Sequence, residues 1–212
     1  ARRIQAPWPM IWLEGTLLSD YLHDLEIVQD YAAWNRLAIL ETLCSYMKWK
    51  PTDVFSCPHN YVARQEDGYL LRKGAVSAEK GERLLIPANM RDGILLAEGK
   101  GNPEWNCSAP HGSGRIMKRE DVAKRFTLSR FRSEMKGIYC TCVSRDTLDE
   151  APFAYRDIRS ISALIQDTAE IRKLLTPVYN YKAGSRSLAP VFTDARRESV
   201  FCTPDLYLIR YF

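Results

Sequence analysis

A change of hydrophobic period at Pro51 is the feature that most constrains the fold. Between Ser19 and Lys50, apolar residues recur at three- and four-residue steps, and Ser19 or Asp20 can cap the start of a helix. Because proline has no backbone N–H to donate, this helix has to end before Pro51. Beyond it, the apolar residues come in short runs separated by turn residues, which is typical of strands. We therefore predict an α+β fold, with mixed sheets and flanking helices.

The remaining elements are predicted from shorter patterns. Strands are expected at residues 54–62, 69–71, 84–87, 94–97, 137–143 and 171–182, and helices at residues 118–126 and 158–165. Turn residues at 66–68 make the first two strands a hairpin, which brings His59 towards Lys73. No periodicity persists in residues 185–212, so we expect a tail of uncertain order after a main body of residues 1–184.

The composition excludes several classes of protein. Of the 212 residues, 46% are hydrophobic and 26% are charged, so the chain can bury a core and disorder is not expected. A net charge of +4 is compatible with a polyanionic partner without requiring one. The six cysteines contain no C-x-x-C pair, and we recognise no signal peptide, which predicts reduced thiols in a cytoplasmic protein. No apolar run is long enough for a membrane span, so no membrane partner is expected.

The strongest indication of chemistry lies in residues 107–119. Its central His111 is followed by four residues that suit a phosphate group: Gly112, Ser113, Gly114 and Arg115. Small residues let backbone N–H groups approach a ligand closely, and an arginine can pair with its charge. An imidazole can ligate a metal, act as a general base or accept a phosphoryl group on nitrogen, and these neighbours favour the last role. A glycine-rich turn with an incidental histidine is the alternative.

Three other positions have both a chemical and a structural interpretation. His59, at a strand end, suits a metal ligand, although a single histidine is more often structural. Lys73 is either a phosphate contact or an ordinary edge-strand lysine. Cys140 and Cys142 share one face of a predicted strand, where they are either paired metal thiolates or buried inert thiols, the commoner case.

Six short motifs follow one another along the chain. They stand at residues 57–61 (CPHNY), 72–75 (RKGA), 99–102 (GKGN), 111–115 (HGSGR), 150–155 (EAPFAY) and 177–183 (PVYNYKA). In this order they resemble the RtcB-type RNA ligases, the family of tRNA-splicing and RNA-repair ligases. The predicted long helix is also similar to one in that family. The resemblance covers the C-terminal half of a family member, which makes residues 1–184 the C-terminal portion of an RtcB-like ligase domain.

The resemblance implies an enzyme that joins RNA 3′-phosphate or 2′,3′-cyclic phosphate ends to 5′-hydroxyl ends, with GTP and Mn²⁺ as cofactors. His111 would be the catalytic histidine that is covalently guanylylated, and His59 would be a ligand in a two-manganese site. Tyr155 would stack on guanine, and Lys182 would hydrogen-bond the base. The residues that would contact the nucleotide are Lys73, Gly112, Ser113, Gly114, Arg115, Tyr155 and Lys182. The partners implied are RNA ends of these two kinds and an archease-like activator.

The chain departs from the family pattern in three places. Ser113 stands where the family usually has alanine, and the chain continues past Lys182, which usually lies close to the C-terminus. The family motifs that give an aspartate, a cysteine and two further histidines to the metals would precede residue 1, so we expect this chain alone to be inactive. Two alternatives stay open: an incomplete chain that retains a guanine-nucleotide pocket, and a metal-dependent phosphoesterase built on the same site.

Overall fold

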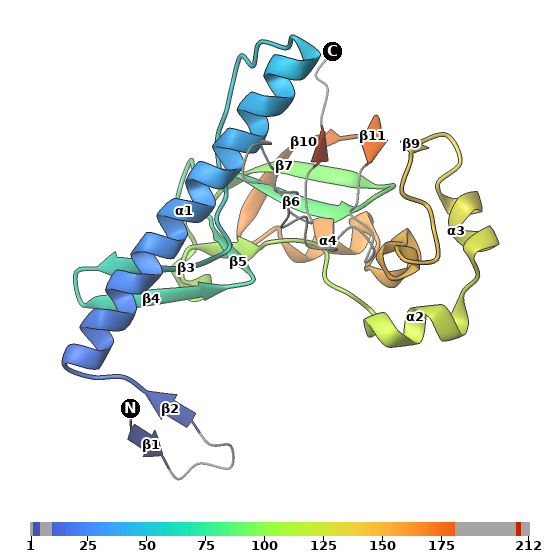
Figure 1. The fold of residues 1–212 in the computed structure, drawn as a ribbon. Helices are drawn as coiled ribbons and strands as arrows, with labels where there is room; N and C mark the ends of the chain where they lie inside the picture. The colour runs from blue at the N-terminus through green and yellow to red at the C-terminus, as the bar shows by residue number, and fades with distance from the viewer. Residues whose placement is uncertain (1, 5–9, 181–206, 209–212) are drawn as a thin grey trace, which may run out of the picture. The chain divides into compact units, whose positions relative to one another are not determined.

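The fold is α+β, as predicted. The computed structural model describes residues 2–4, 10–180 and 207–208, with side chains for residues 13–180. These residues form helices and several small sheets that are mostly antiparallel (Figure 1). The chain divides into two compact units, one of residues 1–56 and 60–73 and the other of residues 57–59 and 74–212. No helix in the described ranges is long and apolar enough to cross a membrane.

The first unit combines one long helix with two hairpins. Strands β1 (Arg2–Ile4) and β2 (Met10–Trp12) pair antiparallel, and α1 (Thr16–Met47) follows them. Strands β3 (Asn60–Gln65) and β4 (Gly68–Lys73) form the predicted hairpin, in which Asn60 is paired with Lys73. Both the long helix and this hairpin are therefore confirmed.

The two ends of α1 are set by the conformation and hydrogen bonds of the backbone. The N-cap that the sequence predicted was wrong. The cap residue is Gly15, because α1 begins earlier than the apolar pattern suggested. Ser19 consequently lies inside the helix, where its hydroxyl donates to the carbonyl of Gly15 at 3.4 Å. At the other end Lys48 takes a left-handed conformation, and the N–H of Trp49 donates to the carbonyl of Cys44 at 2.8 Å, a closure that stops the helix before Pro51.

An antiparallel sheet of order β10-β7-β6 forms the first core of the second unit. It consists of β6 (Arg83–Asn89), β7 (Gly93–Gly99) and β10 (Ala169–Leu175), and α4 (Ile158–Leu164) packs against it (Figure 1). A second pair, β5 (Ala75–Ser77) with β8 (Ser108–Pro110), contributes to the same core. Its buried side chains include Val76, Leu84, Ile86, Leu95, Ala109, Ile161 and Ile165. β6 and β7 were predictable from their short apolar runs, and the structure shows buried and less buried residues alternating along much of β6.

The second core lies beneath the shorter helices. These are α2 (Arg119–Arg125), α3 (Leu128–Glu134) and the 3₁₀ turns η2 (Leu148–Glu150) and η3 (Pro152–Ala154), while another 3₁₀ turn, η1 (Pro103–Trp105), precedes β8. The buried members of this core are Met90, Val122, Phe131, Met135, Cys142, Leu148, Ala151 and Ala154. It supports the segment that leads to Tyr155.

The predicted final strand at residues 171–182 was wrong in its extent. Strand β10 ends at Leu175, and β11 (Tyr179–Asn180) joins a different sheet, between β9 (Tyr139–Cys140) and β12 (Tyr207–Leu208). The intervening Pro177 explains the break, because proline cannot donate to a ladder. Residues 54–57 are irregular rather than extended into a strand, and β5, β8, β12 and α3 were not predicted.

Gly93 allows β7 to approach the end of β10, and its replacement tests that contact. Its φ is +90°, and a Cβ at this position would lie 2.1 Å from the carbonyl oxygen of Leu175. Gly137 is a matched control, since its φ is +93° and nothing lies within 4 Å of its Cβ position. In denaturant titrations, Gly137→Ala should lose about 1–2 kcal/mol of stability from backbone strain. Gly93→Ala should lose clearly more, and equal losses would contradict the close approach.

Candidate functional site

His111 lies between β8 and α2, and its ring is held by the backbone of Gly74. The distance between Nδ1 of His111 and the carbonyl oxygen of Gly74 is 2.6 Å. A carbonyl oxygen can only accept, so this bond assigns the proton of a neutral ring to Nδ1 and leaves a lone pair on Nε2. A Cβ on Gly74 would stand 3.3 Å from Cε1 of His111, and its φ is +66°. Glycine therefore lets the ring lie against the chain.

His59 lies beside His111 in the same unit. The two rings are stacked with centroids 4.9 Å apart and planes 8° from parallel. The carbonyl of His59 accepts hydrogen bonds from the N–H groups of Gly74 at 2.8 Å and Ala75 at 3.3 Å. The segment of Gly74 and Ala75 thus binds the ring of His111 and the backbone of His59. Lys73 is the last residue of β4 and belongs to the first unit.

Ser113 anchors the glycine loop to the sheet. Its N–H donates to the carbonyl of Pro87 at 3.0 Å, and its buried hydroxyl donates to the carbonyl of Ala88 at 2.7 Å. The hydroxyl that distinguishes Ser113 from alanine is therefore hydrogen-bonded, although it is buried. Gly112 and Gly114 flank this anchor, and the carbonyl of Gly114 accepts from the N–H of Arg156 at 3.1 Å.

Arg115 and Tyr155 form an antiparallel β-bridge, and their side chains lie together. The guanidinium carbon of Arg115 lies 4.8 Å from the centroid of the Tyr155 ring, within cation–π range. Glu150 joins the pair, because one carboxylate oxygen accepts from Arg115 at 2.9 Å and the other accepts from the Tyr155 hydroxyl at 2.5 Å. Tyr155 is half-buried, with Arg115 over one face of its ring.

Arg119 completes this cluster. It pairs with Asp149 at 2.5 Å and also with Glu150. Burial opposes the charged form of Arg119, but hydrogen bonds and Coulombic attraction from these two carboxylates outweigh it and raise its pKa further above the ordinary arginine value. Asp149, Glu150 and Arg119 were not predicted as site residues. The only sequence signal was that Glu150 opens the motif that contains Tyr155.

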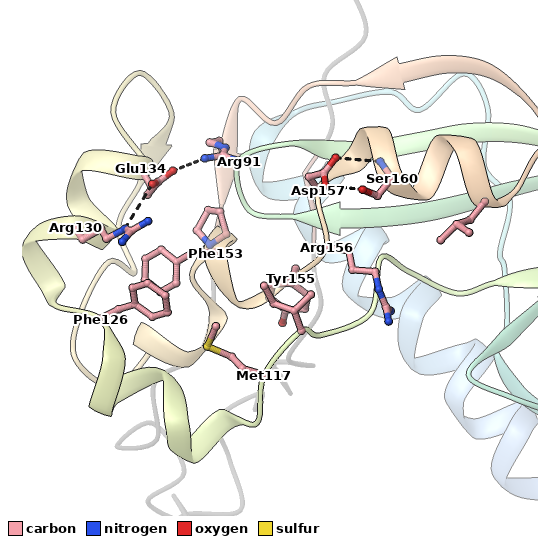
Figure 2. Close-up of a pocket in the computed structure, with 13 residues that line it drawn as sticks. Arg91, Met117, Phe126, Arg130, Glu134, Phe153, Tyr155, Arg156, Asp157 and Ser160 are labelled. Carbon is pink, nitrogen blue, oxygen red and sulfur yellow. Dashed lines mark hydrogen bonds and ion pairs between the residues drawn. The ribbon is translucent and has the colours of Figure 1, made fainter.

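A groove of about 670 Å³ begins at Tyr155. Figure 2 shows Phe126 and Phe153 stacked within it, with ring centroids 4.0 Å apart. The guanidinium carbon of Arg130 lies 4.8 Å from the centroid of the Phe126 ring, and the carboxylate of Glu134 pairs with both Arg91 and Arg130. The other lining residues are Ile116, Met117, Pro152, Arg156, Asp157, Ser160 and Leu164. The two rings and Arg130 contact one another, and Glu134 balances the charge of the arginines beside them.

The described residues do not by themselves form a manganese centre. Within those ranges, no group of three or more histidine, cysteine, aspartate or glutamate side chains could hold a metal ion. Mn²⁺ favours carboxylate, carbonyl or water oxygens, whereas His59 and His111 offer only nitrogen. The predicted base contact, Lys182, lies outside the described residues.

Fold and site together define an α+β protein whose glycine loop presents a histidine beside an arginine–carboxylate cluster. Residues 10–183 match the family described as tRNA-splicing ligase RtcB. The chain belongs to this family, which confirms the resemblance found from its motifs.

Curated relatives agree with this membership. The chain is 32% identical over 176 residues to "RNA-splicing ligase RtcB1" of Escherichia coli strain ATCC 25922, and the match covers 76% of this chain and 43% of that protein. It is 31% identical over 176 residues to "RNA-splicing ligase RtcB" of E. coli K12, with the same coverage. "tRNA-splicing ligase RtcB" of Aeropyrum pernix is 34% identical over 87 residues, or 39% of this chain and 18% of the relative. The chain thus spans less than half the length of these relatives.

Glu150 is the residue through which Arg115, Arg119 and Tyr155 are joined, and only 14% of its side chain is exposed. Glu150→Gln removes the charge but keeps the shape, so denaturant titration should show a loss of about 1–3 kcal/mol. Asp121→Asn is the control, because its pair with Lys124 at 3.0 Å is exposed and should be worth less than about 1 kcal/mol. Equal losses in the two variants would contradict the central position of Glu150.

Proposed function

We propose that this chain is the part of a GTP- and manganese-dependent RNA ligase that supplies the nucleophilic histidine. The whole protein joins RNA 3′-phosphate or 2′,3′-cyclic phosphate ends to 5′-hydroxyl ends. The observation that carries the proposal is the 2.6 Å contact of His111 Nδ1 with the Gly74 carbonyl, which leaves Nε2 to act as the nucleophile. Membership of the RtcB family and the ligase names of its E. coli relatives support it.

In this proposal Nε2 of His111 attacks the α-phosphorus of GTP. A nitrogen–phosphorus bond forms, the bond to the departing oxygen breaks and pyrophosphate leaves. The resulting histidine–GMP passes its GMP to an RNA 3′-phosphate, and a 5′-hydroxyl then displaces GMP to form the new phosphodiester. The covalent step divides one difficult displacement into easier ones.

The neighbouring residues have defined roles. Guanine stacks on the face of Tyr155 away from Arg115, whose guanidinium covers the other face at 4.8 Å. Gly112 and Gly114 let the backbone approach the phosphates, Ser113 fixes that loop to β6, and Arg115 pairs with the developing negative charge. Lys73 and Lys182 are proposed contacts of the nucleotide, the latter with the base.

His59 is the proposed manganese ligand. The rest of the ligand set comes from family segments other than those matched here, because the described residues include no cluster of three ligating side chains. Manganese would supply stabilisation of the attacking and leaving oxygens. We further propose RNA ends and an archease-like activator as partners, and a cytoplasmic location.

The nucleophile is tested with GTP labelled in its α-phosphate. The chain, supplied with Mn²⁺ and the remaining half of a family member, should acquire label that resists denaturation. His111→Ala should lose it entirely, because Nε2 is the atom that forms the bond. His23→Ala is the matched control, since His23 lies on α1 in the first unit and should leave labelling unchanged. Undiminished label in His111→Ala would overturn the assignment.

A second experiment concerns metal content and RNA joining. The 212-residue chain alone should bind no stable pair of manganese ions and join no 3′-phosphate to a 5′-hydroxyl, because two imidazoles make an incomplete site. Addition of the remaining half of a family member should restore both properties, and chelation should abolish joining again.

The same experiment separates the alternatives. Guanylylation of the complemented protein without joining would favour a nucleotide-binding chain that is catalytically incomplete. Release of phosphate from RNA ends without nucleotide would favour a phosphoesterase. Joining by the 212-residue chain alone would contradict the proposed division of the metal site.

A further inference from the structure

Two cysteine sulfurs lie in contact at the end of β9. Cys140 ends β9, and Cys142 follows two residues later, after a bend at Thr141. Their Sγ atoms are 3.2 Å apart. A disulfide bond measures about 2.05 Å, so a small local movement would join them.

The surroundings of the two sulfurs differ. Cys142 is buried in the second core, among residues that include Met90 and Phe131, and its Sγ lies 3.8 Å from the carbonyl oxygen of Asn180. Cys140 is only half-buried at the edge of the same core. A small oxidant can therefore reach Cys140 first, while Cys142 is in place to react with the oxidised sulfur.

A metal site explains the pair less well. Thiolate metal centres take four ligands, and no third ligating side chain joins these two within the described ranges. Disulfide formation, by contrast, needs only the two sulfurs that are present.

We infer that Cys140 and Cys142 are a reversible dithiol–disulfide pair that reacts with peroxides. The Cys140 thiolate attacks one oxygen of hydrogen peroxide, so that a sulfur–oxygen bond forms, the oxygen–oxygen bond breaks and one water leaves after proton uptake. The Cys142 sulfur then displaces the hydroxyl of the Cys140 sulfenic acid, and a second water leaves. Two thiols and one peroxide thus give one disulfide and two waters, with two electrons passing to the peroxide.

Formation of the disulfide between Cys140 and Cys142 changes the sheet around β9. Cys140 is opposite Asn180 in the parallel pairing with β11, and Thr141 and Tyr179 share a hydroxyl hydrogen bond at 2.9 Å. Asn180 is buried, and its Nδ2 donates to the carbonyl of Met90 at 2.7 Å. Drawing the two sulfurs together tightens the bend already present at Thr141 and weakens the pairing of β9 with β11. The inference does not depend on the ligase proposal.

Peptide mapping of the full chain tests the pair. Cleavage after Lys136 and Arg145 releases residues 137–145, which contain Cys140 and Cys142 and no other cysteine. After one equivalent of hydrogen peroxide and then an alkylating reagent, this peptide should be two hydrogens lighter than the reduced peptide and carry no alkyl group. Dithiothreitol should restore double alkylation. Amide hydrogen exchange at Tyr179 and Asn180 should rise in the oxidised protein.

Variants assign the two roles. Cys142→Ser should leave Cys140 as a sulfenic acid that dimedone traps, and Cys107→Ser should leave disulfide formation unchanged. Full double alkylation of the wild-type peptide after peroxide, or added oxygen in place of lost hydrogen, would overturn the inference. Because the decisive measurement is made on the wild-type chain, a variant that fails to fold leaves that result intact.

Discussion

The pairing of β5 with β8 is the constraint on which the candidate site depends. Its register places Ala75 opposite Pro110 and Val76 opposite Ala109, so Gly74 and His111 meet at the end of the ladder. The two strands are only three residues long, yet Val76 and Ala109 are buried in the core that contains the central sheet. Burial of these side chains, rather than the short ladder, fixes the register.

The arginine–carboxylate cluster has a different role from that of a simple cationic patch. Arg115 and Arg119 are balanced by Asp149 and Glu150, so the four side chains carry no net charge together. Paired charges of this kind contribute little net attraction for a distant anion, but they restrict the side chains that they join. The cluster therefore orients Arg115 and the ring of Tyr155, while Arg130 in the groove lies over the Phe126 and Phe153 rings.

The sequence predicted the elements that carry a sustained apolar pattern. The long α1 showed three- and four-residue steps, β6 and β7 stood out as short apolar runs between turn residues, and proline marked where α1 had to end. Strands of two or three residues, such as β8, are too short to show a period, and the cap at Gly15 has no side chain to signal it. The candidate site residues were proposed from motifs, but their contacts join segments far apart in the chain. The bond from Arg115 to Glu150 is one that only the tertiary fold creates.

The stacking of His59 on His111 keeps the nitrogen lone pairs of the two imidazoles from pointing at one common position. A ring nitrogen that carries no proton presents its lone pair in the plane of its own ring. With the planes 8° from parallel and the centroids 4.9 Å apart, the two sets of lone pairs run side by side and do not converge on one ion. The two nitrogens that the proposed function uses, one on His59 towards a metal and one on His111 towards phosphorus, would therefore act at separate points, and neither reaction would have to displace the other.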